Sequence, residues 1–170
     1  MSERVALRVR SLSRALCAAI AVVVFVSDQV TKAMVEKSIP EHSVIPIFPR
    51  FFNLIHTKNA GAAFGLFSES PAPWKTVMLI VVSAGLLLTV AALAWKSRRL
   101  DWQASVGMAL ILGGALSNLF DRIRIGRVVD FLDVYYGTYH WPTFNVADSA
   151  IVVGAGFLIL QVIFSEEHHS

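Results

Sequence analysis

The sequence has few charged residues. Only 16% of its 170 residues are Asp, Glu, Lys or Arg, whereas 55% are hydrophobic, and the net charge is +3. Soluble domains usually carry about 25% charged residues, so this composition indicates a protein for which lipid is part of the solvent. The basic residues stand in short clusters beside apolar segments and do not alternate with aromatic residues. This pattern argues against a nucleic-acid partner.

Cysteine and clustered histidine are also scarce. Cys17 is the single cysteine, which excludes an internal disulfide. It lies in an apolar segment, where free cysteine behaves as a small hydrophobic residue. The histidines show no HExxH or similar spacing, so the sequence predicts neither a zinc site nor a cofactor. They are His42, His56, His140, His168 and His169.

Four segments approach the length of about 20 mostly apolar residues that a helix needs to cross a bilayer. We expect these spans at residues 12–35, 77–95, 102–120 and 146–164. Inside a membrane the backbone polar groups must be satisfied internally, so each segment is expected to be helical. The sequence therefore predicts one integral membrane domain over residues 1–170, an all-α bundle of four transmembrane helices.

The first segment also fits a second interpretation. Several arginines precede its apolar stretch, as in a secretory signal peptide. However, no small-residue cleavage site follows Val26, and residues 27–32 keep helical character. We therefore favour a retained first span.

The basic residues predict the orientation. The N-terminal arginines and the group Lys96, Arg98 and Arg99 fall on the same side of a four-span protein. The positive-inside rule assigns that side, with both termini, to the cytoplasm. Residues 36–75 and 121–143 then lie outside. Residues 51–57 are strand-like, so we expect a small sheet on the outer membrane surface.

Three arginines on the expected outer side conflict with this rule: Arg122, Arg124 and Arg127. One interpretation is that the other basic clusters determine the orientation and these arginines have no special role. The other is that they bind lipid phosphate or pair with nearby aspartates. Both interpretations stay open for Arg124 and Arg127. A functional role is favoured for Arg122, which shares a helix face with Asn118 and Asp121.

The topology gathers carboxylates at the outer membrane face, where the third span ends and the fourth begins. Ionisable residues at membrane depth are costly and mark functional sites. Two neighbouring carboxylates share one proton, so one acts as general base and the other as general acid in peptide hydrolysis without a metal. The candidates are Asp28, Asp121, Asp130, Asp133 and Asp148.

Single aspartates also have structural interpretations. Asp148 stands where an acidic residue caps a helix, and Asp121 is expected to pair with Arg122 or Arg124. The pattern alone leaves open a protease, structural ion pairs, and a proton relay in a non-enzymatic transporter or channel subunit. The relay is the weaker alternative, because the second and third spans offer little polar route below the outer face.

Five short motifs, in matching order and spacing, resemble those of bacterial lipoprotein signal peptidases. They read DQVTK, NAGAAF, GGALSNLFDR, VVDF and FNVAD, at residues 28–32, 59–64, 113–122, 128–131 and 144–148. The main local departure is Ser117, where the family commonly has glycine.

The resemblance implies an aspartyl endopeptidase of the bacterial inner membrane that cleaves prolipoproteins just before a diacylglyceryl-modified cysteine. It also implies inhibition by the cyclic peptide globomycin. It assigns catalysis to Asp130 and Asp148, a choice that spacing alone does not make over Asp121 or Asp133. By the same resemblance, substrate-facing or supporting residues are Asn59, Gly61, Asn118, Arg122 and Asn145, and structural motif residues are Asp28, Lys32 and Asp121.

Overall fold

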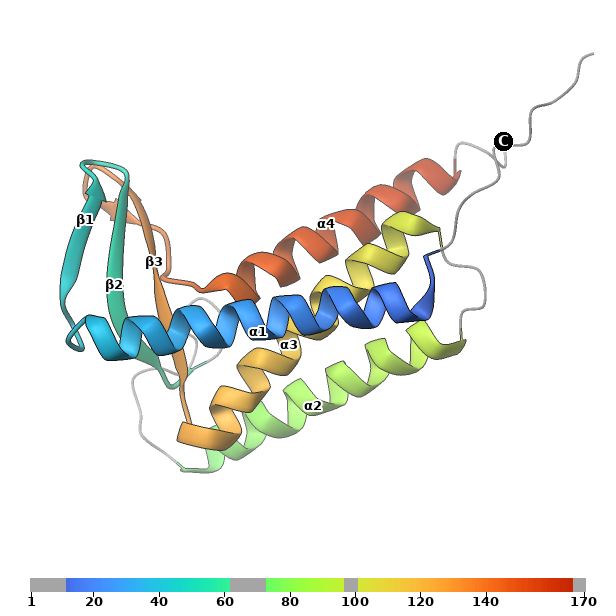
Figure 1. Cartoon of the computed structure of the whole chain (residues 1–170), viewed down its shortest axis with the longest axis horizontal. Helices are drawn as coiled ribbons and strands as arrows, with labels where there is room; N and C mark the ends of the chain where they lie inside the picture. The colour runs from blue at the N-terminus through green and yellow to red at the C-terminus, as the bar shows by residue number, and fades with distance from the viewer. Residues whose placement is uncertain (1–11, 62–72, 97–100, 167–170) are drawn as a thin grey trace, which may run out of the picture.

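The computed structural model describes residues 12–61, 73–96 and 101–166. Within these residues, four helices are long and apolar enough to cross a membrane. They lie beside one another as a bundle (Figure 1), which confirms the expected all-α membrane architecture. The helices are α1 (Arg14–Ser38), α2 (Pro73–Lys96), α3 (Trp102–Ile125) and α4 (Val146–Glu166).

Helix α3 continues beyond the expected end of the third span. Its C-cap is Gly126, whose φ of 73° is left-handed and whose N–H donates to Arg122 O at 3.0 Å. Glycine adopts this conformation without a Cβ penalty, so the helix ends there. Asp121 is therefore a helical residue with its side chain inside the bundle, where it is 1% exposed.

A small antiparallel sheet stands at one end of the bundle (Figure 1). Its strand order is β1-β2-β3-β4. Strand β2 confirms the strand expected at residues 51–57. The other strands were expected only as parts of a small sheet, without residue ranges. The bounds are β1 Val44–Phe48, β2 Phe52–Asn59, β3 Val128–Tyr136 and β4 Tyr139–His140.

Helix α3 packs against the other three helices. Two consecutive glycines make the contacts close. A Cβ on Gly113 would stand 2.5 Å from Ala21 O, and one on Gly114 would collide with Ala147 O. Glycine lets helix backbones approach this closely. This packing brings α1 and α4 to α3 beside Ala147, the residue before Asp148.

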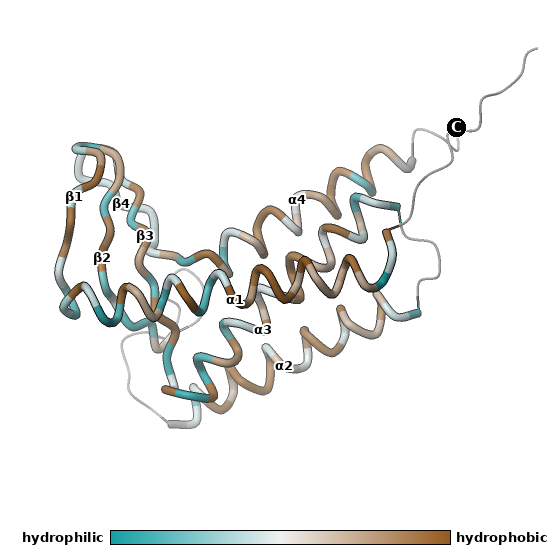
Figure 2. Tube along the Cα trace, in the orientation of Figure 1, coloured by the Kyte–Doolittle hydropathy of each residue, from teal (hydrophilic) through white to brown (hydrophobic). Residues whose placement is uncertain are grey.

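Apolar residues dominate the helices, and hydrophilic residues recur where the helices meet the sheet (Figure 2). Several of these polar residues are nevertheless buried, with less than a tenth of their surface exposed: Asp28, Lys32, Asn118, Asp121, Asp130 and Asn145. A buried polar group is costly unless it is paired. The junction between bundle and sheet is therefore the place to look for a site.

Candidate active site

Asp130 lies in β3, opposite Thr57 of β2, and is 2% exposed. Two asparagine side chains hold its carboxylate. Asn145 Nδ2 donates to Asp130 Oδ1 at 2.8 Å, and Asn59 Nδ2 donates to Asp130 Oδ2 at 3.1 Å. Asn59 ends β2 and Asn145 precedes α4, so two different elements fix one carboxylate.

Asp148 lies in the first turn of α4. Its backbone N–H donates to Asn145 Oδ1 at 2.9 Å, and its Oδ2 accepts from Asn145 N at 3.3 Å. This reciprocal pair is a capping box, so the capping role expected for Asp148 is present. The second oxygen is used differently, because Asp148 Oδ1 accepts from Asn118 Nδ2 at 2.7 Å.

Asn145 joins the two aspartates. It is fully buried, and it binds Asp130 through its amide nitrogen while it caps the turn that carries Asp148. One asparagine therefore sets the position of both carboxylates. The structure brings together the pair that the family resemblance singled out.

The surroundings of Asp130 favour its protonated form. Burial, and next the charge of Asp148, raise the pKa of Asp130 from 3.8 to about 7. The hydrogen bonds from Asn59 and Asn145 and the charge of Lys32 act in the opposite direction. A carboxyl that keeps its proton near neutral pH, beside a second carboxylate, is the arrangement needed for general acid–base chemistry.

Arg122 connects α3 to the end of β2. Its Nη1 donates to Asn118 O at 3.2 Å, and its Nη2 donates to Gly61 O at 3.3 Å. Gly61 N in turn donates to Asn59 Oδ1 at 2.8 Å. The remainder of that motif, residues 62–64, lies outside the described residues. Arg122 thus stands beside the pair and holds the segment that contacts Asp130.

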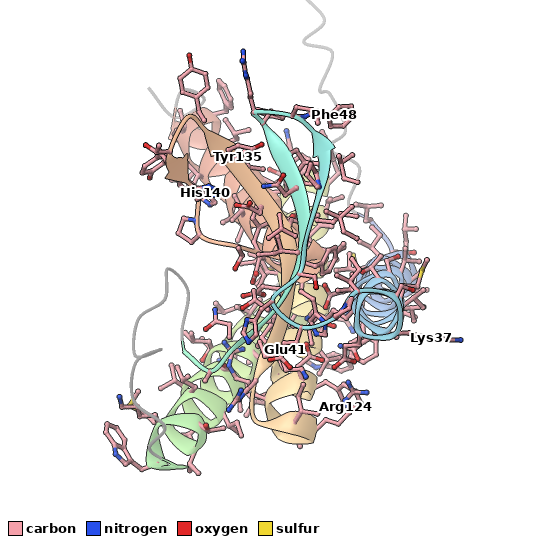
Figure 3. The ribbon with its side chains drawn as sticks, turned by 90° about the vertical axis from the view of Figure 1, so that its left-hand side faces the viewer. Lys37, Glu41, Phe48, Arg124, Tyr135 and His140 are labelled. Carbon is pink, nitrogen blue, oxygen red and sulfur yellow. The ribbon has the colours of Figure 1, made fainter. Side chains whose placement is uncertain are left out.

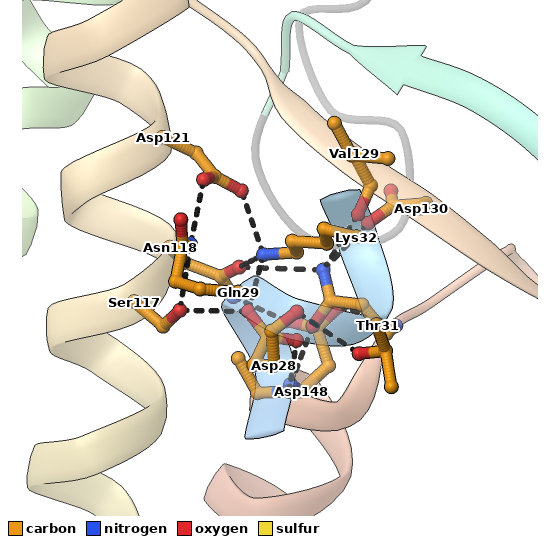
Figure 4. Close-up of polar contacts among 12 residues, drawn as sticks. Asp28, Gln29, Thr31, Lys32, Ser117, Asn118, Asp121, Val129, Asp130 and Asp148 are labelled. Carbon is orange, nitrogen blue, oxygen red and sulfur yellow. Dashed lines mark hydrogen bonds and ion pairs between the residues drawn. The ribbon is translucent and has the colours of Figure 1, made fainter. Parts of the chain in front are cut away.

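A second polar cluster lies next to the pair, among α1, α3 and the start of α4 (Figure 4). Lys32 Nζ stands 2.6 Å from Asp28 Oδ2 and 2.7 Å from Asp121 Oδ2. It also donates to Asn118 Oδ1 at 2.9 Å. Asp28, Lys32 and Asp121 therefore form one buried ion cluster. This cluster contacts Asn118, which is a hydrogen-bond partner of Asp148.

The expected pairing of Asp121 with Arg122 or Arg124 is wrong. Asp121 pairs with Lys32 of α1, and Arg124 pairs with Glu36 at 3.3 Å. Local spacing could not indicate either contact, because both join α3 to a helix more than eighty residues earlier. The arginine beside Asp121 turns instead to Gly61 O.

Asp133 is buried in a separate group. Asn53 Nδ2 donates to Asp133 Oδ2 at 2.8 Å, and His140 Nδ1 hydrogen-bonds to Asp133 Oδ1 at 2.8 Å. Tyr135 stacks on His140 with ring centroids 4.8 Å apart (Figure 3). Residues three apart on a strand face opposite sides, so Asp133 points away from Asp130.

Comparison with known proteins identifies the family. Residues 20–164 match the family model described as signal peptidase (SPase) II. The chain belongs to the signal peptidase II family. It is therefore a peptidase of lipoprotein signal peptides, and its four apolar helices fit a multi-pass membrane protein.

Curated relatives named lipoprotein signal peptidase align along most of the chain. The protein of Solibacter usitatus is 43% identical over 85% of this chain and 88% of its own. That of Syntrophotalea carbinolica is 42% identical over 83% and 86%. A solved structure described as a bacterial membrane enzyme superposes with a TM-score of 0.83 at 28% identity, covering 92% of this chain and 93% of that one.

Two residues of the polar cluster, Gln29 and Ser117, were not among the site residues predicted from the sequence. Gln29 Nε2 donates to Ser117 Oγ at 2.9 Å and to Asp121 Oδ1 at 2.8 Å. Ser117 Oγ donates to Asp28 Oδ2 at 2.7 Å. A signal was available, since both residues lie within motifs, and Ser117 is the position that departs from the usual glycine.

Proposed function

We propose that this peptidase is an aspartyl endopeptidase that cleaves prolipoproteins just before the diacylglyceryl-modified cysteine. The observation that carries the proposal is the pair Asp130 and Asp148, tied together by Asn145 where an apolar bundle meets a sheet. The family supports the substrate class. The buried, hydrogen-bonded pair supports the chemistry.

Asp148 is the proposed general base. Its carboxylate accepts hydrogen bonds from Asn118 and from the backbone of Asn145, and it stands at a helix N-terminus, where negative charge is favoured. It removes a proton from water while the water oxygen bonds to the scissile carbonyl carbon. Asp130 donates its proton to the carbonyl oxygen, which gives a neutral tetrahedral gem-diol.

Collapse of this intermediate completes the reaction. The proton that Asp148 holds passes to the leaving nitrogen as the C–N bond breaks. One hydroxyl of the gem-diol returns a proton to Asp130 as the new carboxyl forms. Both aspartates regain their starting states, so the cycle consumes one water and releases two peptides.

The expected orientation has structural support. Arg14 Nη2 donates to Trp95 O at 3.3 Å, so the basic ends of α1 and α2 meet at the end of the bundle opposite the sheet (Figure 1). By the positive-inside rule that end is cytoplasmic. Both termini then face the cytoplasm, and the pair lies near the outer interface, where a lipid-anchored cysteine presents its peptide bond.

The test is to incubate the detergent-purified protein with a diacylglyceryl-modified prolipoprotein and to identify the products by mass spectrometry. The proposal predicts a product whose first residue is the lipidated cysteine, and inhibition by globomycin. Cleavage at another bond, or equal cleavage of the unlipidated precursor, would overturn it.

A further inference from the structure

The chemistry proposed above gives no task to the cluster around Lys32. The cluster nevertheless consists of five side chains joined by short contacts (Figure 4). Asp28, Gln29 and Lys32 come from α1, and Ser117 and Asp121 come from α3. Asp28 and Ser117 are fully buried. Burying so many polar groups costs free energy. We therefore ask whether their contacts fix the conformation of the proposed catalytic residues. Their contacts lead to Asp148 along two paths.

The first path runs through the backbone. Asp28 Oδ1 accepts from Ala147 N at 2.8 Å. The first N–H groups of a helix have no partner within it, so a carboxylate from α1 satisfies one at the start of α4. Ala147 directly precedes Asp148 and is fully buried. The orientation of the Asp28 carboxylate therefore sets the position of the turn that carries Asp148.

The second path runs through side chains. Lys32 Nζ donates to Asn118 Oδ1, and Asn118 Nδ2 donates to Asp148 Oδ1. Lysine only donates hydrogen bonds, so the amide oxygen must face Lys32 and the amide nitrogen must face Asp148. The same lysine contacts Asp28 at 2.6 Å, so both paths meet at the Asp28–Lys32 pair.

Ser117 contacts the Asp28–Lys32 pair, where the two paths meet. Its hydroxyl donates to Asp28 Oδ2 at 2.7 Å and accepts from Gln29 Nε2 at 2.9 Å. Gln29 is itself fixed by its second bond, to Asp121 Oδ1 at 2.8 Å. Without the hydroxyl, Asp28 keeps Lys32 and Ala147 as partners, but its second oxygen loses a directional donor. The terminal torsion of Asp28 is broad, so with one donor fewer the orientation of its carboxylate is less narrowly fixed.

We propose that Ser117, supported by Gln29, is a positioning residue for Asp148 in this chain. It acts through Asp28 and the backbone of Ala147 and does not touch the substrate. This inference rests on the proposed function, in which Asp148 is the base. Removing the hydroxyl leaves Asp28 paired with Lys32 and with the N–H of Ala147, so variants at this position are expected to fold.

Two variants remove the hydroxyl: Ser117→Ala, and Ser117→Gly, which also removes the Cβ. The matched control is Ser105→Ala, a buried serine of the same helix away from the pair. Small displacements of a catalytic group are costly, so kcat should fall by about tenfold in both Ser117 variants. KM should stay within about twofold, because no substrate-facing group has changed.

Coupling to Gln29 separates positioning from loss of stability. If Ser117 and Gln29 act as one unit, Gln29→Ala in the Ser117→Ala background should cost little more kcat than Ser117→Ala alone. Independent, multiplicative losses would contradict the proposal. So would a Ser117→Ala enzyme with wild-type kcat, or an equal kcat loss in Ser105→Ala.

Hydrogen exchange tests the same path without using activity. In Ser117→Ala, a peptide covering residues 145–149 should exchange its amide protons several-fold faster than in the wild type, and Ser105→Ala should leave it unchanged. Unchanged exchange in Ser117→Ala would defeat the positioning role whatever the enzyme does. A wild type that cleaves no lipidated prolipoprotein would instead defeat the proposed function.

Discussion

At the scale of the residue, asparagines decide how the two proposed catalytic carboxylates behave. Asn59, Asn118 and Asn145 supply the side-chain hydrogen bonds to Asp130 and Asp148. An amide donates without adding charge, so the carboxylates are oriented without being neutralised by a cation. The site can therefore hold one protonated and one ionised carboxyl close together.

Activity should fall as the pH rises through about 7. The pKa of Asp130 is raised to about 7 by burial and by the charge of Asp148, and its protonated form is the proposed acid. Above that pH the acid is lost. Replacing Asn59 with Ala removes a hydrogen bond that lowers this pKa, so the alkaline limb should move to higher pH. The measurement is the pH dependence of kcat in both proteins.

An alkaline limb that stays in place in Asn59→Ala would show that another group controls it. Lys58→Ala is a suitable control, because Lys58 neighbours Asn59 but pairs with Glu41 at 2.9 Å. Its profile should retain the wild-type limb.

Arg122→Ala should weaken both processing and globomycin binding while the protein stays folded. Arg122 donates to Gly61 O and Asn118 O, and its guanidinium can also donate to carbonyl oxygens of a bound peptide. The check is inhibitor affinity and turnover on the same purified variant. Arg124→Ala, which breaks only an exposed pair with Glu36, serves as the control. If both quantities match the wild type in Arg122→Ala, this arginine is only a surface charge.

At the scale of the element, helix packing positions the site. Gly114 lets α3 approach the start of α4, and a Cβ there would collide with Ala147 O. Gly156 of α4 has open space around it. The two glycines thus offer a matched pair, one at a close contact and one where a methyl group fits.

Gly114→Ala should lower stability and activity together, and Gly156→Ala should not. Overpacking costs about 1–3 kcal/mol, whereas alanine at an unhindered helical glycine is favourable by about 0.5–1 kcal/mol. Thermal unfolding in detergent measures the first effect and kcat the second. Equal behaviour of the two variants would show that α3 and α4 do not approach as described.

The elements that the sequence predicted well are those with a strong local signal. Each helix is a long apolar segment, and β2 begins with the aromatic and apolar residues Phe52, Leu54 and Ile55 shortly after a turn. Strand β1 contains Pro46, which weakens a strand prediction. Strand β3 carries two aspartates, a residue type that is depleted in strands. The Lys32–Asp121 pair depends on how α1 meets α3, which no local spacing specifies.

At the scale of the whole molecule, the protein combines an apolar bundle with a polar junction beneath a small sheet. The amino-acid composition predicted the apolar bundle. The positions of the aspartates at the ends of the spans predicted the polar junction. The proposed catalytic pair was indicated by the family motifs, because spacing left Asp121 and Asp133 as equal candidates. The structure separates them by partners: Asp121 binds Lys32, and Asp133 binds Asn53 and His140.

Chelation should leave the activity intact. The proposed base is a carboxylate that acts directly on water, so no step needs a metal ion. Turnover of the purified enzyme after treatment with a strong chelator should equal that of the untreated enzyme. A loss that added zinc restores would contradict the mechanism.

The most direct test of the central claim is the cleavage of a lipidated prolipoprotein by three variants of equal size change, each confirmed to be folded in detergent. Asp130→Asn and Asp148→Asn each remove one proton-transfer group and should abolish product, whereas Asp133→Asn should retain most of the activity. Near-wild-type cleavage by Asp130→Asn or Asp148→Asn would contradict the account.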